Sequence, residues 1–446
     1  MTSRVQFATK VELGEGTKFM SQELIDEADR RAGGNLQREN GSPEHTPYRW
    51  YSDPDVYALE QTQIYQGKTW NFLALTAEIP NPGDFKSTFV GDTPVVVTRT
   101  KNGDIAAWVN RCAHRGAMVC RELRGNATKH TCVYHQWSYD AEGNLRGVPF
   151  QRGIKGKAGM PKTFDTKENG LQKLRVDTYH GLVFGTMDDT TPTLVDYLGP
   201  QMTPWLDRIF AGRELVYLGC ARQFSRSNWK LYLENTKDPY HASLLHLFHT
   251  TFNILRATMD SRQIHDDRHG LHSIFTSTRR TDGADASAYT ADNLRTYNAA
   301  MTLQDPEILR MREEFDEPIT NHIQAIFPSL VVQQIHNTLA CRQLLPKGPD
   351  NFELIFHYFG YADDDDELRE MRLLQANLVG PAGLISMEDT EVTELVQQGV
   401  RATPERHSTS LMGIDSPPEE SAASSVSEIM VRTFWKGYRD LMWPTK

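Results

Sequence analysis

The 446-residue sequence predicts an α+β protein with two folded parts. The first observation is a series of short apolar or alternating segments over residues 69–188, punctuated by turn signals, which is typical of a small antiparallel β domain. The second is a change near residue 190 to longer helical patterns mixed with strands. With 39% hydrophobic residues, the chain is large enough for a core in each part.

The chain begins with a polar, turn-rich stretch. Residues 1–45 are expected to form a loosely ordered extension that holds one short helix over 21–31. A helix is predicted next over 53–66, because Asp53 can cap it and Pro54 suits its first position. We assign residues 46–68, which include this helix, to the second folded part.

Short strands are predicted in the β-rich part, where the pairs Gly83-Asp84 and Asn102-Gly103 mark turns. The expected strands are 70–75, 94–98, 105–109 and 182–185.

Residues 189–446 are expected to mix helices and strands. Helical patterns cover 229–248, 364–377 and 426–443, and strands are expected at 325–334 and 352–360. The acidic run 363–366 is interpreted as a helix start, because negative charge suits the helix dipole there. Residues 416–427 are interpreted as an exposed loop.

The most informative motif combines cysteine and histidine. Cys112 and His114 form C-x-H, and seventeen residues later Cys132 and His135 form C-x-x-H. Two thiolates and two imidazoles on paired loops can hold a Rieske [2Fe–2S] cluster, with the cysteines on one iron and the histidines on the other. A zinc site is the alternative, but zinc motifs usually group like ligands. The alternation of Cys and His therefore predicts a Rieske cluster on loops at hairpin tips.

The other cysteines carry no such pattern. Five cysteines are few and odd in number, which argues against a disulfide framework. We expect Cys120, Cys220 and Cys341 to be small buried side chains.

Charge and hydropathy exclude some classes of protein. A net charge of −10 offers no footprint for nucleic acid. No apolar run has the length of a membrane span, and no signal peptide opens the chain. The sequence predicts a cytoplasmic protein that binds neither nucleic acid nor membranes.

A second group of metal-binding residue types lies at Asp238, His241 and His246. Five residues on a regular helix span about 140° around its axis, so both histidines can face one metal only if the helix is irregular there. Two histidines and a carboxylate form the facial triad of non-haem Fe(II) oxygenases. This pattern predicts a mononuclear iron site.

From about residue 50 to its end, the chain resembles the large (α) subunits of Rieske non-haem iron aromatic-ring-hydroxylating oxygenases. C-x-H-R-G, C-x-Y-H-x-W and D-x-Y-H-x₄-H carry this resemblance. The overall resemblance is strongest to the branch that acts on aromatic carboxylates, which includes terephthalate dioxygenases and salicylate 5-hydroxylases. The resemblance implies a Rieske domain over 69–188 and a catalytic domain over 189–446, with a helix-covered antiparallel sheet of the helix-grip kind.

The resemblance also implies a third iron ligand. Asp389 stands at the ligand position of the segment 380–389, and the neighbouring Glu388 is the alternative. His249 is expected to be a pocket or core histidine. Asn235 is expected to hydrogen bond near the iron rather than bind it.

Asp238 has an implied role in electron transfer. Its carboxylate would bridge His241 on the iron and His135 on a cluster across a subunit interface. A helix-capping aspartate before Pro239 is the alternative.

The resemblance implies the terminal oxygenase α subunit of a multicomponent system that breaks down aromatic compounds. Its expected partners are O₂, a small β subunit in an α₃β₃ assembly with α–α contacts, and a ferredoxin and/or NAD(P)H-dependent reductase. The same iron site supports monooxygenation and dioxygenation. A Rieske electron carrier is the alternative from another class, but a carrier needs no facial triad.

The substrate is predicted from Arg342. A strand expected over 331–342 would place Gln334, His336 and Arg342 on one face, where the arginine could bind a carboxylate bidentately. A surface arginine paired with an acid is the alternative.

The number of carboxylates is predicted from the segment after Asp389. Terephthalate-type members are expected to carry a second basic residue there, but this chain has Gln397-Gln398, with Arg401 further on. We therefore expect a substituted monocarboxylate of salicylate, anthranilate or halobenzoate type, with a terephthalate-type dicarboxylate as the alternative.

Overall fold

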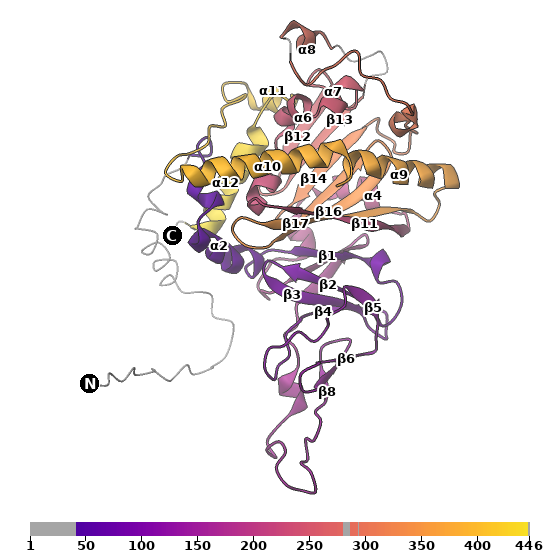
Figure 1. Cartoon of the computed structure of the whole chain (residues 1–446), viewed down its shortest axis with the longest axis vertical. Coiled ribbons are helices and arrows are strands. Elements are labelled where there is room, and N and C mark those ends of the chain that lie inside the picture. The colour runs from indigo at the N-terminus through magenta and orange to yellow at the C-terminus, as the bar shows by residue number, and fades with distance from the viewer. Residues whose placement is uncertain (1–41, 280–285, 293, 445–446) are drawn as a thin grey trace, which may run out of the picture. The chain divides into compact units, whose positions relative to one another are not determined.

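Antiparallel sheets organise the described part of this computed structural model, which comprises residues 42–279, 286–292 and 294–444 (Figure 1). The helix predicted over 21–31 lies outside these residues. The strands of the first half are β1 (Asn71–Leu75), β2 (Asp84–Val90), β3 (Thr93–Arg99), β4 (Ile105–Val109), β5 (Arg124–Asn126), β6 (Lys129–Thr131), β7 (Ser138–Asp140), β8 (Leu145–Gly147), β9 (Arg175–Tyr179) and β10 (Leu182–Thr186).

These strands form three small sheets, in the orders β4-β3-β2-β5, β6-β7-β8 and β1-β10-β9. The four strands predicted in this part match β1, β3, β4 and β10. The short strands β5 to β8 had no sequence signal, because three residues are too few to show a period. Residues 40–446 form one unit, so the boundary predicted at residue 188 stays a prediction.

A seven-stranded sheet dominates the second half, in the order β11-β17-β16-β15-β14-β13-β12. Its strands are β11 (Leu215–Ser225), β12 (Asp260–His265), β13 (Ser273–Thr278), β14 (Asn321–Ile326), β15 (Leu330–Ile335), β16 (Thr338–Pro346) and β17 (Phe352–Tyr361). Figure 1 shows the helices α9 (Asp366–Val379) and α10 (Leu384–Ala402) crossing this sheet. The predicted α+β class, with a helix-covered antiparallel sheet, is confirmed.

The remaining helical elements are short, apart from the last. They are η1 (Tyr48–Tyr51), α2 (Pro54–Glu60), η2 (Gln61–Tyr65), η3 (Thr76–Glu78), η4 (Thr166–Asn169), α3 (Leu194–Leu198), α4 (Thr203–Phe210), α5 (Trp229–Asn235), α6 (Pro239–Leu245), α7 (Leu247–Thr251), α8 (Ser287–Ala291), η5 (Pro306–Leu309), α11 (Pro418–Ala422) and α12 (Ile429–Met442). None of the helices in the described ranges has the length and hydropathy of a membrane span.

The helix predicted over 53–66 is confirmed, with a local change of winding. Asp53 caps α2 through a hydrogen bond from the Asp55 N–H, and the helix continues into the π-turn η2. Glu60 at its end forms a fully buried ion pair with Lys230 and accepts a hydrogen bond from the Trp229 indole N–H at 2.8 Å. These contacts fix α5, which carries Asn235.

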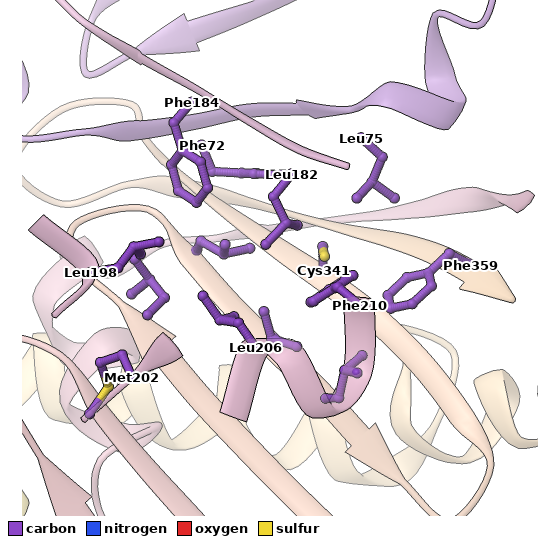
Figure 2. Close-up of a cluster of buried hydrophobic side chains, with 14 of the residues drawn as sticks. Phe72, Leu75, Leu182, Phe184, Leu198, Met202, Leu206, Phe210, Cys341 and Phe359 are labelled. Atoms are coloured by element: carbon purple, nitrogen blue, oxygen red, sulfur yellow. The ribbon is translucent and has the colours of Figure 1, made fainter. Parts of the chain in front are cut away.

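A shared hydrophobic core joins the β1-β10-β9 sheet to the seven-stranded sheet (Figure 2). Phe72 and Phe184 from the small sheet lie above Leu206 and Phe210 of α4, with Phe359 of β17 beside them. A second core, around Trp108, lies under the Cys and His loops.

Two strand predictions were wrong for the same reason. Residues 325–334 contain a hairpin, in which β14 and β15 pair from Ile326↔Leu330 outward and Pro328 stands in the turn. Residues 331–342 contain the next hairpin, β15–β16, with His336 and Asn337 as its two-residue turn. His336 has a φ of +52° without being glycine, so the usual turn signal was absent.

Three smaller predictions were also corrected. The helix expected over 229–248 is divided into α5, α6 and α7. A new helix, α6, begins after Asp238, and the extended backbone of His246 separates α6 from α7. The loop expected over 416–427 contains α11. Cys220 is exposed, whereas Cys120 and Cys341 are buried as predicted.

Candidate metal centres and substrate cavity

Two loops of matching geometry carry the residues of the first motif. In each loop the cysteine N–H donates to the carbonyl oxygen five residues later, at 2.8 Å for Cys112 and 2.9 Å for Cys132. In each, the N–H four residues after the cysteine donates back to the cysteine carbonyl at 2.9 Å. These returning residues, Gly116 and Gln136, have φ values of +76° and +57°. The two loops therefore hold their cysteines on backbones with the same hydrogen bonds, while the histidine follows by two residues in the first loop and by three in the second.

The side chains on these loops leave ligand atoms available. Both thiols are buried, and the rings of His114 and His135 lie 4.5 Å apart. Nδ1 of His114 is buried without a hydrogen-bond partner. The Tyr139 hydroxyl lies 3.2 Å from the Cys112 sulfur, where it can donate to a thiolate.

The four side chains do not close around one ion. Among the described residues, one group of potential metal ligands has its ligand atoms within 4.8 Å of one another. That group lies outside these loops and consists of His241, His246 and Asp389. A tetrahedral zinc site would bring its four ligand atoms to one centre. Two cysteines and two histidines that stay apart fit a cluster of two irons instead.

The second site depends on a break in a helix. α6 ends at Leu245, His246 is extended with φ −87° and ψ 92°, and α7 begins at the next residue. This break brings the rings of His241 and His246 to 5.4 Å. The irregularity that the five-residue spacing requires is present.

Asp389 reaches the two histidines from α10. Its Oδ1 lies 3.4 Å from Nε2 of His241 and 3.3 Å from Nε2 of His246. The α9–α10 turn packs closely against β17, which needs glycine at position 380, because a Cβ there would lie 1.9 Å from the Tyr358 hydroxyl oxygen.

Two neighbours orient these three side chains. The alternative ligand Glu388 accepts a hydrogen bond from Nδ1 of His246 at 2.8 Å, on the ring nitrogen that does not face Asp389. Outer partners of metal-binding histidines commonly stand there. Nδ2 of Asn235 lies 3.2 Å from both Nε2 of His241 and Oδ1 of Asp389, so Asn235 hydrogen bonds beside the site as predicted.

The charges of the site suit a divalent cation. Burial alone would raise the pKa of Asp389, but His246 and His241 hold it well below its usual range. Burial lowers the pKa of His241, but Asp238 and Asp389 outweigh it and raise that pKa to about 10. An anionic oxygen facing two imidazole nitrogens is the ligand set that non-haem Fe(II) binds.

Asp238 caps a helix and also faces His241. Its Oδ1 caps α6 by accepting a hydrogen bond from the Tyr240 N–H at 3.0 Å, and its Oδ2 faces Nδ1 of His241 at 3.5 Å. The side chain remains 24% exposed. Asp238 and His135 are both described and do not touch each other; Figure 1 shows the β6–β8 region and α6 on opposite sides of β1.

A cavity of about 560 Å³, counting its open mouth, adjoins the three possible iron ligands. Its apolar lining comes from Leu255, Phe275, Ile323, Ile335 and Ile385.

Arg342 lines this cavity from β16 and is only 6% exposed. Its guanidinium donates to Oε1 of Gln333 at 2.6 Å and to the Tyr232 hydroxyl at 2.9 Å. Within the described ranges, no carboxylate lies within 4.0 Å of it. The alternative of a surface arginine paired with an acid is therefore wrong.

The face predicted for Arg342 needs correction. Arg342 pairs with Val331, so it shares a face with Gln333 and not with Gln334, and His336 is in the turn. Gln333 and Tyr232 were missed. Tyr232 precedes Asn235 by three residues on α5, and this spacing could have indicated it.

The residues after Asp389 add no positive charge to the cavity. Gln397 is buried and bonds the Asn228 N–H and the Tyr51 carbonyl. Arg401 pairs with Asp350 at 3.2 Å on the surface. Among the described lining residues, Arg342 alone is a lysine or arginine.

Fold and sites together define an oxygenase with two kinds of iron centre, and known proteins show the same combination. Residues 69–161 match the Rieske [2Fe-2S] domain, and residues 216–443 match the ring hydroxylating alpha subunit (catalytic domain). The chain belongs to the family of ring-hydroxylating alpha subunits, oxidoreductases whose cofactors are a Rieske [2Fe–2S] cluster and a mononuclear non-haem iron. The class of enzyme and the cofactors predicted from the sequence are confirmed.

Individual relatives cover nearly the whole chain. The large subunit of anthranilate 1,2-dioxygenase from Burkholderia cepacia is 62% identical over 92% of this chain and 95% of that protein. The terminal oxygenase component subunit alpha 2 of terephthalate 1,2-dioxygenase from Comamonas sp. is 43% identical over 91% and 97%. The structure of naphthalene 1,2-dioxygenase from Rhodococcus sp. has the same fold, with a TM-score of 0.74 and 23% identity over 94% and 97%.

Proposed function

We propose that this chain is the terminal oxygenase subunit of a multicomponent system that hydroxylates a substituted aromatic monocarboxylate with O₂. One observation carries the substrate class: the buried Arg342 guanidinium lines the cavity beside His241, His246 and Asp389 and has no carboxylate partner in the described part of the chain. A buried cation without an anion favours an anionic ligand. The 62% identity to an anthranilate dioxygenase subunit supports an aminobenzoate as the leading candidate.

The site residues divide into two ligand sets. Cys112, Cys132, His114 and His135 would hold the cluster, and their matched loops and available ligand atoms support this. His241, His246 and Asp389 would hold the mononuclear iron, with Glu388 as the partner that orients His246. When bound, the cluster supplies single electrons and the iron supplies O₂ activation.

The chain itself would bind and orient the substrate. Arg342 would hold the carboxylate through paired N–H donors, while Gln333 and Tyr232 fix the guanidinium. The isoleucine-rich lining would hold the ring beside the ligand set and keep water out. A correctly placed ring is the main contribution that a protein makes in cofactor chemistry of this kind.

Asp238 would connect the two centres between copies of the chain. Its Oδ2 already faces His241, and its partial exposure leaves room for a histidine from a neighbour, which we take to be the neighbour's equivalent of His135. Since electrons must enter from outside, this requires an assembly with α–α contacts, for which α₃β₃ is our proposal, and a ferredoxin and/or NAD(P)H-dependent reductase.

A dicarboxylate substrate is the second candidate, supported by the terephthalate dioxygenase relative. The described lining contains one guanidinium, that of Arg342. A second carboxylate would therefore enter the cavity without a cationic partner, which argues against a dicarboxylate substrate. Salicylate and halobenzoates satisfy the same single arginine.

Replacing Arg342 with alanine tests the substrate class. Loss of one side of a buried charge-assisted pair costs about 2–5 kcal/mol, which is roughly 30- to 5,000-fold in kcat/KM. In Arg342→Ala, kcat/KM on anthranilate should fall by that factor, while kcat/KM on the amide analogue should fall much less. Arg342→Lys should rescue little, because a point charge does not replace the planar fork.

The control for Arg342 is Arg401→Ala, which removes a surface guanidinium outside the cavity. It should keep wild-type kcat/KM on both substrates. An equal loss on the carboxylate and on the amide in Arg342→Ala would show that Arg342 has a structural role and does not bind the carboxylate.

A further inference from the structure

Two buried side chains in the same cavity carry polar atoms that have no hydrogen-bond partner among the described residues. His249 is 4% exposed and Asn321 is 2% exposed, and both line the cavity. Within the described ranges, neither ring nitrogen of His249 has a hydrogen-bond partner, nor does Oδ1 of Asn321. Buried polar groups are almost always paired, so each exception needs an explanation.

The hydrogen bonds of Asn321 fix which of its atoms is free. Its Nδ2 donates to the Ile254 carbonyl oxygen and to the Ser277 hydroxyl, both at 2.9 Å. Because a backbone carbonyl can only accept, the amide nitrogen must stand on that side. The oxygen that remains is a hydrogen-bond acceptor.

His249 adds a second group of the same kind. It lies on α7, with its ring 5.0 Å from the ring of His246. A neutral imidazole offers one acceptor and one donor. Together, His249 and Asn321 can offer two acceptors and one donor to a ligand.

Arg342 contributes to the cavity from the same face of the sheet as Asn321. Asn321 pairs with Ile335, and Ile335 pairs with Thr338, so these residues stand in one row across the sheet. Arg342 is four residues further along the same face of β16, and its guanidinium donates to Gln333, which pairs with Ala340 between them. The cavity therefore combines one cation with the free acceptors of Asn321 and His249.

We propose that His249 and Asn321 form a second substrate-binding point, which accepts a hydrogen bond from an amino or hydroxyl substituent on the ring. This inference rests on the proposed function and narrows its substrate class: the ligand is an aromatic carboxylate that also carries a hydrogen-bond donor. Unsubstituted benzoate would leave both acceptors unpaired. Two-point binding would also fix which ring carbons face His241, His246 and Asp389.

The test compares anthranilate with benzoate in the assembled oxygenase, supplied with its redox partners. A site that hydrogen bonds a substituent rejects the analogue that lacks it, so wild type should prefer anthranilate by about 100-fold or more in kcat/KM. His249→Leu and Asn321→Leu should each reduce that ratio at least tenfold. His249→Gln, which keeps a donor and an acceptor, should retain more of the ratio than His249→Leu. Arg401→Ala should keep the wild-type ratio.

The outcomes separate this inference from the proposed function. Turnover of both substrates with an equal ratio in wild type and in the leucine variants would overturn the inference and leave the proposed function standing. Absence of turnover on every aromatic carboxylate would overturn both. If His249→Leu loses iron or fails to fold, the test uses the two remaining measurements. These are the ratio of kcat/KM on anthranilate to that on benzoate in wild type and the same ratio in Asn321→Leu.

Discussion

Replacing Asp389 with alanine should abolish hydroxylation while the Rieske spectrum stays intact. His241, His246 and Asp389 form one group of ligand atoms, and Asp389 supplies its carboxylate oxygen. Without it, two neutral imidazoles hold a divalent iron poorly. The variant should lose one iron per chain and all product, because the cluster ligands lie on other loops. Metal analysis, visible spectroscopy and product assay measure these three quantities.

The matched control for Asp389→Ala is Glu391→Ala, which removes an exposed carboxylate from the same helix. It should keep full iron and full activity. Full iron and turnover in Asp389→Ala would instead assign the ligand to Glu388 or to a residue elsewhere. Loss of the Rieske spectrum in Asp389→Ala would mean that the variant has lost its fold.

Replacing Asp238 with asparagine should nearly stop hydroxylation with both metal sites loaded. Asparagine caps a helix as well as aspartate does, so α6 should stay in place. It removes the charge beside Nδ1 of His241 and an acceptor for a second histidine. We expect a loss on the order of 100-fold, the upper range for outer partners of metal ligands. Single-turnover reoxidation of the reduced cluster, with substrate and O₂ present, measures the step directly.

The conservative change at Asp238 separates bridging from capping. Asp238→Ala removes the cap as well, so it should also lower thermal stability, which Asp238→Asn should not. Fast reoxidation of the cluster coupled to product in Asp238→Asn would rule out a role in electron transfer.

Both candidate metal sites could be predicted because all but one of their proposed ligands are close in sequence. Cys112, His114, Cys132 and His135 occupy two short loops, and His241 and His246 flank one helix break. Such spacing is visible without knowledge of long-range packing. Asp389 is more than a hundred residues away, and only the resemblance to a family indicated it.

The substrate cavity was harder to predict because strand pairing builds it. Arg342 was found, but its neighbours were misassigned, because turns at Pro328 and His336 divide segments that look continuous. The register of β14, β15 and β16 brings Asn321 to the cavity and Gln333 to Arg342. A single sequence does not specify such pairing, and no glycine marks the turn at His336.

We infer that O₂ is used to hydroxylate an aromatic carboxylate held by this chain. The most direct test supplies the assembled protein, its redox partners and anthranilate with isotopically labelled O₂. We expect labelled oxygen in the ring product, with uptake of O₂ that depends on the carboxylate substrate. Uptake that is independent of the substrate, or a product whose oxygen comes from water, would contradict it.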